Sequence, residues 1–183
     1  MKAIGVIAVV GGKHSGKTTT AQALINGLVK KGYKVAAVKH VHEPKFTIDT
    51  EGKDTWLFAK AGAQTIISVA PNEIAIIKKV NTESCGLNDI LKECGDACII
   101  VIEGFTKLVM KEPYVLKVVA AKNASEIDEA AKLFNPIIAF TGPIATKHEH
   151  ERLSIPYIDV LKNPERLVEL VESELQKKRG SLG

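Results

Sequence analysis

Cysteine, arginine, aromatic residues and long apolar runs are all scarce in this chain of 183 residues. Its three cysteines, Cys85, Cys94 and Cys98, form no CxxC pair, which excludes a disulfide scaffold and a zinc ribbon. The longest unbroken apolar run, residues 97–102, is far too short to span a bilayer. Aromatic residues make up 5% of the chain and the charges are spread along it, unlike a nucleic-acid-binding surface. These absences favour a cytoplasmic protein without a membrane or nucleic-acid partner.

The rest of the composition is that of an ordinary globular domain. Hydrophobic residues make up 45% and charged residues 25%, and the net charge is +4. The length fits one domain, and neither an internal repeat nor a linker of distinctive composition divides the chain. We therefore expect a single domain over residues 1–176, followed by a frayed basic tail over residues 177–183.

Apolar runs typical of buried strands alternate with segments of helical periodicity. The expected strands cover residues 3–10, 34–39, 64–70, 73–80, 97–102, 113–121 and 136–141. The expected helices cover residues 18–31, 53–61, 87–93 and 126–133, and a last helix opens at Asn163-Pro164. Ser125 and Asp128 resemble a capping box for the fourth helix. This alternation predicts an α/β fold with a mostly parallel sheet and helices on both faces. The hairpin over residues 64–80 and the strand after Pro113 predict added antiparallel strands.

The strongest motif is Gly-Gly-Lys-His-Ser-Gly-Lys-Thr at residues 11–18, which matches G-x-x-x-x-G-K-[ST] between a predicted strand and a predicted helix. Its glycines let backbone N–H groups turn inward as a phosphate nest at the positive end of the helix. Lys17 is expected to reach the β- and γ-phosphates, and the Thr18 hydroxyl to ligate Mg²⁺. The residues predicted to hold the nucleotide here are Gly11, Lys13, His14, Ser15, Gly16, Lys17, Thr18 and Thr19. Together with the alternating elements, the motif predicts a three-layer P-loop NTPase fold.

Two acidic residues are candidates for completing a metal site beside this loop. Glu103 directly follows the apolar strand at residues 97–102, and Asp49 lies in the polar loop that leaves the strand at residues 34–39. Ligand sites of such folds lie at the carboxyl ends of the strands. We therefore expect Glu103 and Asp49 to be Mg²⁺ ligands and, with Lys17, catalytic residues; solvated loop acids are the alternative. Lys39, Lys53 and Asp54 are comparable further candidates, because a lysine near the γ-phosphate could stabilise transferred charge. His40 is equally consistent with lining the site or supporting the loop.

The element that would read the base is not evident. The Asn-Lys-x-Asp motif of Ras-type GTPases is absent, and Thr146-Lys147-His148-Glu149 is only a loose echo beyond the last predicted strand. Phe140, Thr141 and Gly142 lie better for a base contact. The cluster at residues 148–150 is interpreted as an exposed loop. The motifs alone do not distinguish guanine from adenine.

These motifs together resemble those of the molybdopterin-guanine dinucleotide biosynthesis protein B (MobB) family. The stretches that carry the resemblance are residues 11–19, 39–42, 49–55 with 59–63, and 101–105. It covers the chain well from residue 4 to about residue 120. Two features depart from the family pattern: the loop over residues 43–48, and Thr106, which stands where a lysine is common in the family. These departures leave substrate and partner contacts open.

The resemblance implies a dimeric protein that binds GTP with Mg²⁺ and hydrolyses it weakly. It also implies an accessory role in molybdenum cofactor biosynthesis, beside a MobA-type guanylyltransferase. Slow hydrolysis agrees with the scarcity of arginine, since the chain holds only Arg152, Arg166 and Arg179. A small-molecule kinase using the same loop, and a scaffold that nucleotide stabilises without turnover, are the alternatives, so enzymatic activity stays open.

Overall fold

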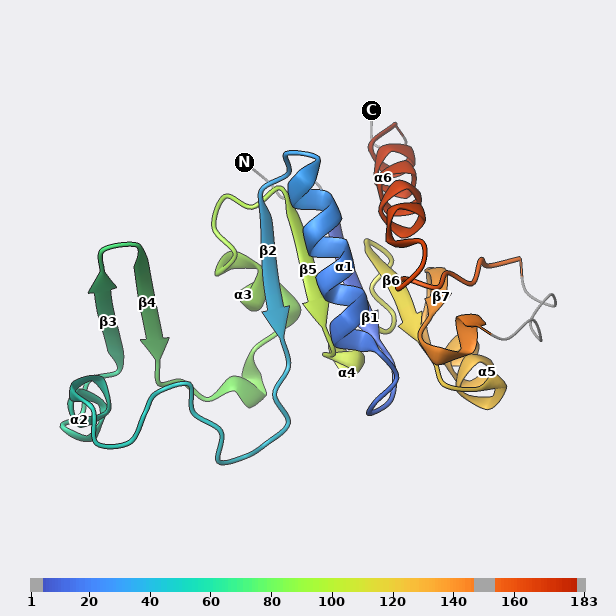
Figure 1. Cartoon of the computed structure of the whole chain (residues 1–183). Helices are drawn as coiled ribbons and strands as arrows, with labels where there is room; N and C mark the ends of the chain where they lie inside the picture. The colour runs from blue at the N-terminus through green and yellow to red at the C-terminus, as the bar shows by residue number, and fades with distance from the viewer. Residues whose placement is uncertain (1–4, 147–153, 181–183) are drawn as a thin grey trace. The chain divides into compact units, whose positions relative to one another are not determined.

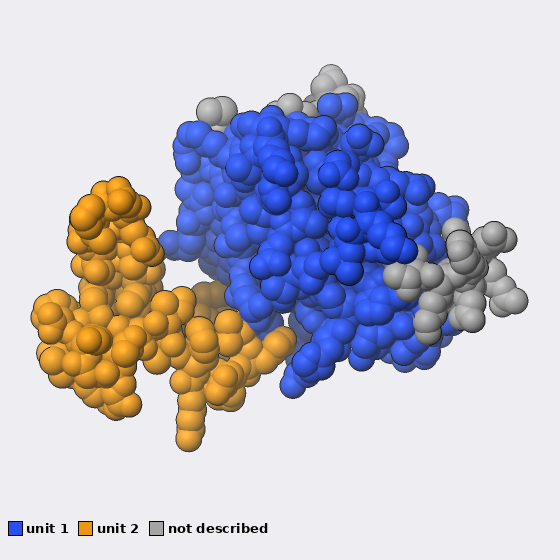
Figure 2. Space-filling view, in the orientation of Figure 1, with its two compact units in different colours: residues 1–40, 87–183 blue, residues 41–86 orange. Residues whose placement is uncertain are grey.

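The chain forms two compact units (Figure 2). Unit 1 comprises residues 1–40 and 87–183, and unit 2 comprises residues 41–86. The computed structural model describes residues 5–146 and 154–180, so the polar cluster at residues 148–150 lies outside the described residues. In the part of the chain that the structure describes, no helix is both long and apolar enough to cross a membrane.

A five-stranded parallel sheet forms the centre of unit 1, in the order β2-β5-β1-β6-β7 (Figure 1). Its strands are β1 (Gly5–Val10), β2 (Val35–Lys39), β5 (Ile99–Glu103), β6 (Val115–Ala120) and β7 (Ile137–Thr141). The three central strands are almost entirely buried, and they are rich in valine, isoleucine and leucine. Such strands suit a sheet that is covered on both faces.

The strand after Pro113 corrects the prediction of an added antiparallel strand. β6 lies between β1 and β7 and runs parallel to both. Parallel neighbours need a crossover connection, and the sequence shows no long helical pattern between residues 103 and 113. The short helix α4 (Thr106–Val109) serves as part of that crossover. A helix of one turn leaves no periodicity to detect, which is why the strand direction was predicted wrongly.

Helices cover both faces of this sheet, which confirms the predicted three-layer architecture (Figure 1). Helices α1 (Lys17–Lys30) and α6 (Pro164–Gly180) pack on one face. Helices α3 (Leu87–Lys92), α4 and α5 (Ala124–Leu133) pack on the other. Helices α1 and α6 approach closely at Gly27, where an added Cβ would lie 2.4 Å from Val168 Cγ2.

Two helix ends differ from the predictions. The cap of α5 is Asn123, whose Oδ1 accepts a hydrogen bond from the Glu126 N–H at 3.0 Å, so the predicted cap Ser125 lies inside the first turn. Asparagine and serine cap helices about equally well, so the sequence offered two registers. Helix α6 continues to Gly180, through part of the expected frayed tail. Lys178 Nζ donates to the Pro113 carbonyl at 2.6 Å, which anchors that last part of the helix.

Unit 2 contains α2 (Asp54–Lys60), the strands β3 (Thr65–Ala70) and β4 (Glu73–Lys78), and a 3₁₀ turn over Thr82–Ser84. The strands pair antiparallel around Pro71-Asn72, which confirms the predicted hairpin. Ile66 is the one buried hydrophobic residue of unit 2, whereas unit 1 has a whole core of them. Unit 2 therefore has little apolar interior of its own.

Candidate functional site

Positive φ angles, and at Gly11 also close packing, explain two glycines of the phosphate loop, residues 11–18, between β1 and α1. Gly11 and Gly16 have φ angles of 143° and 92°, which favour glycine. A Cβ on Gly11 would lie 2.1 Å from the Ala120 carbonyl oxygen. Ser15 is fully buried, and its hydroxyl donates to the Gly12 carbonyl at 3.0 Å. The loop is thus held in shape by its own contacts and by the end of β6, at the positive end of α1.

The residues predicted to contact a base lie at the end of β7, behind the phosphate loop. Phe140 is fully buried in the apolar core, and Thr141 is fully buried with its hydroxyl oxygen 3.5 Å from that of Thr20. Their side chains therefore present no surface to a base, because both face into packed layers. Gly142 has a φ of 92°, and a Cβ there would lie 2.4 Å from the Ser15 carbonyl oxygen. Its role in the structure is to let β7 approach the loop.

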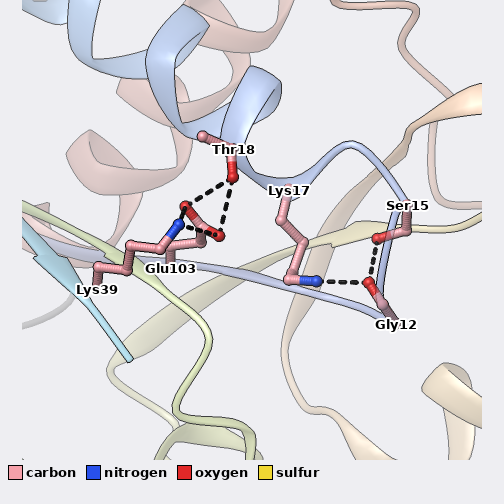
Figure 3. A network of polar contacts seen from close by, with 6 residues as sticks. All are labelled: Gly12, Ser15, Lys17, Thr18, Lys39 and Glu103. Carbon is pink, nitrogen blue, oxygen red and sulfur yellow. Dashed lines mark hydrogen bonds and ion pairs between the residues drawn. The ribbon is translucent and has the colours of Figure 1, made fainter. Parts of the chain in front are cut away.

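Lys17 lies at the first position of α1 and folds back across the loop. Its Nζ donates to the Gly12 carbonyl at 2.5 Å (Figure 3). Burial lowers the pKa of Lys17 from its ordinary value; the negative charge of Glu103 opposes this shift and the positive charge of Lys39 adds to it. The Lys17 ammonium thus lies against the backbone of the phosphate loop. The neighbouring side chains of Lys13, His14 and Thr19 are exposed.

Thr18, Glu103 and Lys39 meet beside the loop (Figure 3). The Thr18 hydroxyl donates to the two carboxylate oxygens of Glu103, at 3.0 and 3.1 Å. Lys39 Nζ contacts the same two oxygens at 3.1 and 3.2 Å. Glu103 and Lys39 are opposite each other in the β2–β5 register, and the Glu103 side chain is only 14% exposed. The carboxylate is therefore a shared acceptor for two donors.

The residues after Glu103 adopt an unusual backbone. Gly104 and Phe105 both have positive φ, 91° and 52°. A phenylalanine in the left-handed backbone conformation is uncommon, and such backbone strain persists where surrounding contacts fix the residue. Here the Phe105 ring stacks on His40 with centroids 4.4 Å apart, and the His40 N–H donates to the Glu103 carbonyl at 3.0 Å. The turn that carries Glu103 is thus clamped to the end of β2.

The sequence named Lys39 as a candidate near the γ-phosphate but did not predict its contact with Glu103, and it gave Phe105 no role in the site. The signal for Lys39 was its position at the end of a strand that later proved to pair in parallel with the strand of Glu103. Phe105 lay inside the Glu-Gly-Phe stretch without a stated role. Its contribution depends on backbone angles, which residue types alone do not specify.

Asp49 and Lys53 both belong to unit 2. Asp49 Oδ1 accepts hydrogen bonds from the Thr55 hydroxyl at 2.7 Å and from the Thr50 N–H at 2.9 Å. Lys53 precedes α2 and occupies its cap position. These contacts give Asp49 a local structural role, whereas the Lys53 side chain makes no cap hydrogen bond to α2. Their predicted roles beside the phosphate loop stay predictions.

The donor set at Glu103 suits a hard cation. Among the described residues, no group of three or more histidines, cysteines or acids converges as a metal site. Magnesium in nucleotide sites commonly takes one or two protein oxygens and completes its shell with phosphate and water. The Thr18 hydroxyl and the Glu103 carboxylate fit that requirement, whereas a structural zinc site would need nitrogen or sulfur ligands.

The parallel sheet, the loop between β1 and α1, and the carboxylate at the end of β5 define a P-loop NTPase fold. The family model described as MobB, molybdopterin guanine dinucleotide synthesis protein B, matches residues 6–140. The chain belongs to this family.

Relatives and solved structures agree with this assignment. A Haemophilus influenzae protein named molybdopterin-guanine dinucleotide biosynthesis adapter protein is 29% identical over 129 residues, 69% of this chain and 71% of its own length. The Escherichia coli protein of the same name is 25% identical and covers 97% of both chains. A crystal structure of molybdopterin-guanine biosynthesis protein B is 25% identical with a TM-score of 0.68, over 93% of this chain and 99% of that one. Bacillus subtilis MobB, 23% identical with a TM-score of 0.68 over 91% and 97%, shows the shared fold.

Proposed function

We propose that this chain binds Mg²⁺ and GTP at the phosphate loop and hydrolyses GTP slowly, as an accessory protein of molybdopterin guanine dinucleotide biosynthesis. The observation that carries the proposal is the meeting of Thr18 and Glu103 at 3.0 Å beside the Lys17 ammonium. A hydroxyl, a carboxylate and a cation then converge at one end of a phosphate nest. The family assignment supports the pathway, and its name supplies guanine as the base.

In this proposal each residue has a distinct task. Loop N–H groups and Lys17 bind the β- and γ-phosphates, and Thr18 with Glu103 holds the cation. Bound Mg²⁺ would supply charge neutralisation at the phosphates. Fast GTPases also use an arginine against the developing charge, and neither the phosphate loop nor residues 39–54 contain one. Hydrolysis is therefore expected to be slow until a partner or a second subunit supplies a cation.

Calorimetry with Mg·GTP and Mg·ATP tests the binding step. Wild type should prefer GTP, and Lys17→Ala should lose about tenfold to 100-fold in affinity, because a charge-assisted contact to phosphate is removed. Lys30→Ala, at the other end of α1, is the matched control and should bind as wild type does. Equal binding by Lys17→Ala contradicts the site, and a preference for ATP contradicts the guanine assignment and favours the kinase alternative.

Turnover distinguishes the two candidate acids. Glu103→Gln should keep nucleotide binding but slow phosphate release, because the amide is a poorer cation ligand. Asp49→Asn is the comparison variant. A wild-type rate in Glu103→Gln with a reduced rate in Asp49→Asn would transfer the metal role to Asp49. Transfer of phosphate to an acceptor in place of its release would identify a kinase.

We also propose a homodimer formed through unit 2, with a MobA-type guanylyltransferase as a further partner. Ile67 faces Ile76, and Val69 faces Ile74, across the β3–β4 ribbon. These side chains are 58–73% exposed, on a two-stranded ribbon that is only marginally stable alone. An exposed apolar face of this kind marks an interaction surface.

Light scattering during size-exclusion chromatography tests the dimer. Ile67→Lys should yield monomer, because a charge would be buried in the interface. Leu161→Lys alters an exposed leucine of unit 1, 79% accessible, and should leave the mass unchanged. A dimer that survives Ile67→Lys places the interface elsewhere. Capture of a purified guanylyltransferase, compared between the GTP and GDP forms, tests the second partner.

A further inference from the structure

Lys39 forms an ion pair with the acidic side chain of the candidate site, Glu103. Its Nζ contacts the two carboxylate oxygens of Glu103 at 3.1 and 3.2 Å, so neither oxygen is preferred. The Lys39 side chain is 58% exposed, whereas that of Glu103 is 14% exposed. A largely buried carboxylate is thus neutralised by an ammonium that approaches from the solvent side.

The oxygens that Lys39 contacts are also those that face Thr18. The Thr18 hydroxyl donates to the same pair at 3.0 and 3.1 Å. In the proposed function, the carboxylate and this hydroxyl hold the divalent cation. An ammonium and a divalent cation compete for one carboxylate, because each provides the positive charge that the other would supply.

We infer that Lys39 is the resident counter-ion of Glu103, that a divalent cation takes its place, and that the released ammonium pairs with the terminal phosphate of GTP. This inference rests on the proposed function and deepens it. It makes Lys39 a residue that distinguishes a nucleoside triphosphate from a diphosphate, since only the triphosphate offers the released ammonium a new partner.

The surroundings of Lys39 allow its end to move while its backbone stays fixed. The backbone is paired to β5 in register, and the next residue donates its N–H to the Glu103 carbonyl at 3.0 Å. The stack of His40 on Phe105 adds a second clamp. The side chain itself is a flexible four-carbon stem ending in a compact charge, which can exchange partners without moving the strand. The positive charge of Lys39 also contributes to the lowered pKa of Lys17, so the two ammonium groups are close enough to repel each other.

Two measurements on Lys39→Met test the inference. Manganese titrated into the GDP complex, followed by loss of the free-ion EPR signal, should bind about two- to fivefold tighter than in wild type, because its competitor is gone. The ratio of GTP to GDP affinity, measured by calorimetry with excess Mg²⁺, should fall about tenfold, because a charge-assisted phosphate contact is lost. A residue that merely supported the fold would not move these two quantities in this combination.

Two further variants sharpen the test. Lys39→Arg keeps the positive charge and should restore wild-type manganese affinity. Lys34→Met removes another lysine adjoining β2, from its exposed pair with Asp96 at 2.6 Å, and should change neither quantity. Circular dichroism melting of all variants checks that the fold is retained.

The outcomes separate this inference from the proposed function. If wild type binds Mg·GTP but Lys39→Met binds manganese more weakly, Lys39 orients Glu103 and the inference is wrong. Unchanged manganese affinity and an unchanged GTP to GDP ratio in Lys39→Met also overturn it and leave the proposed function intact. If folded wild type binds neither nucleotide, the proposed function and the inference fail together.

Discussion

The two units of the chain treat their apolar residues in opposite ways. In unit 1, isoleucine, valine and leucine fill two buried clusters, one on each face of the parallel sheet. In unit 2, the same residue types lie on the open face of a two-stranded ribbon, where Val69 is 73% exposed. Composition alone does not distinguish a buried core from an exposed ribbon, because both contain side chains that water disfavours. What differs is the number of layers available to cover them.

The largest expected effect on stability comes from replacing one glycine in each unit by alanine. Gly142→Ala should destabilise unit 1 by about 4 kcal/mol, because a left-handed backbone and a 2.4 Å approach to Ser15 are both penalised. In unit 2, Gly62 has a φ of 107° but open space where a Cβ would lie, so Gly62→Ala should reduce stability by only about 1–2 kcal/mol. Urea unfolding measures both; equal losses would contradict the tight contact of β7 with the phosphate loop.

Truncation of one apolar side chain in each unit is the next comparison. Leu24→Ala removes a fully buried side chain of α1 and should cost about 3 kcal/mol. Ile67→Ala should change stability by about 0.5 kcal/mol or less when the protein is monomeric. The only tryptophan, Trp56, lies in α2, so its fluorescence follows unit 2 while far-UV circular dichroism follows mainly unit 1. A shift of the Trp56 transition by Leu24→Ala would show that the units unfold together.

The buried lysine of unit 1 predicts a pH dependence. Lys117 Nζ donates to the Glu112 and Asn135 carbonyls, and burial lowers its pKa to about 8. Between pH 8 and 10.5 the unfolded chain binds more protons at this site, so stability should rise with pH by about 3 kcal/mol. Lys117→Met should remove this rise, whereas Lys34→Met, at an exposed lysine, should retain it. Identical pH profiles for wild type and Lys117→Met would refute the assignment.

The smallest effect concerns the metal site. Thr18→Ala removes one candidate cation ligand but leaves Lys17 and the loop backbone in place. Nucleotide affinity without Mg²⁺ should be unchanged, and the gain on adding Mg²⁺ should fall about fivefold, equivalent to about 1 kcal/mol. Gln22→Ala, at an exposed position further along α1, is the matched control. A normal Mg²⁺ response in Thr18→Ala would exclude its ligand role.

The sequence by itself determined the phosphate loop, a mostly parallel sheet, the hairpin and the three layers. These features depend on local patterns: runs of β-branched residues, helical periodicity, and glycines at fixed spacing before a helix. It also placed Glu103 at the end of a strand, because the apolar run stops there.

Only the tertiary structure decided which strand ends become neighbours. It set Lys39 opposite Glu103, put Phe140 and Thr141 in the core, and made β6 a central parallel strand through a one-turn crossover helix. It also separated residues 41–86 as a unit, without any change of composition at either boundary. The physical reason is that strand order and burial arise from pairing between distant segments. Those pairings depend on how whole layers cover one another, and no local pattern encodes that.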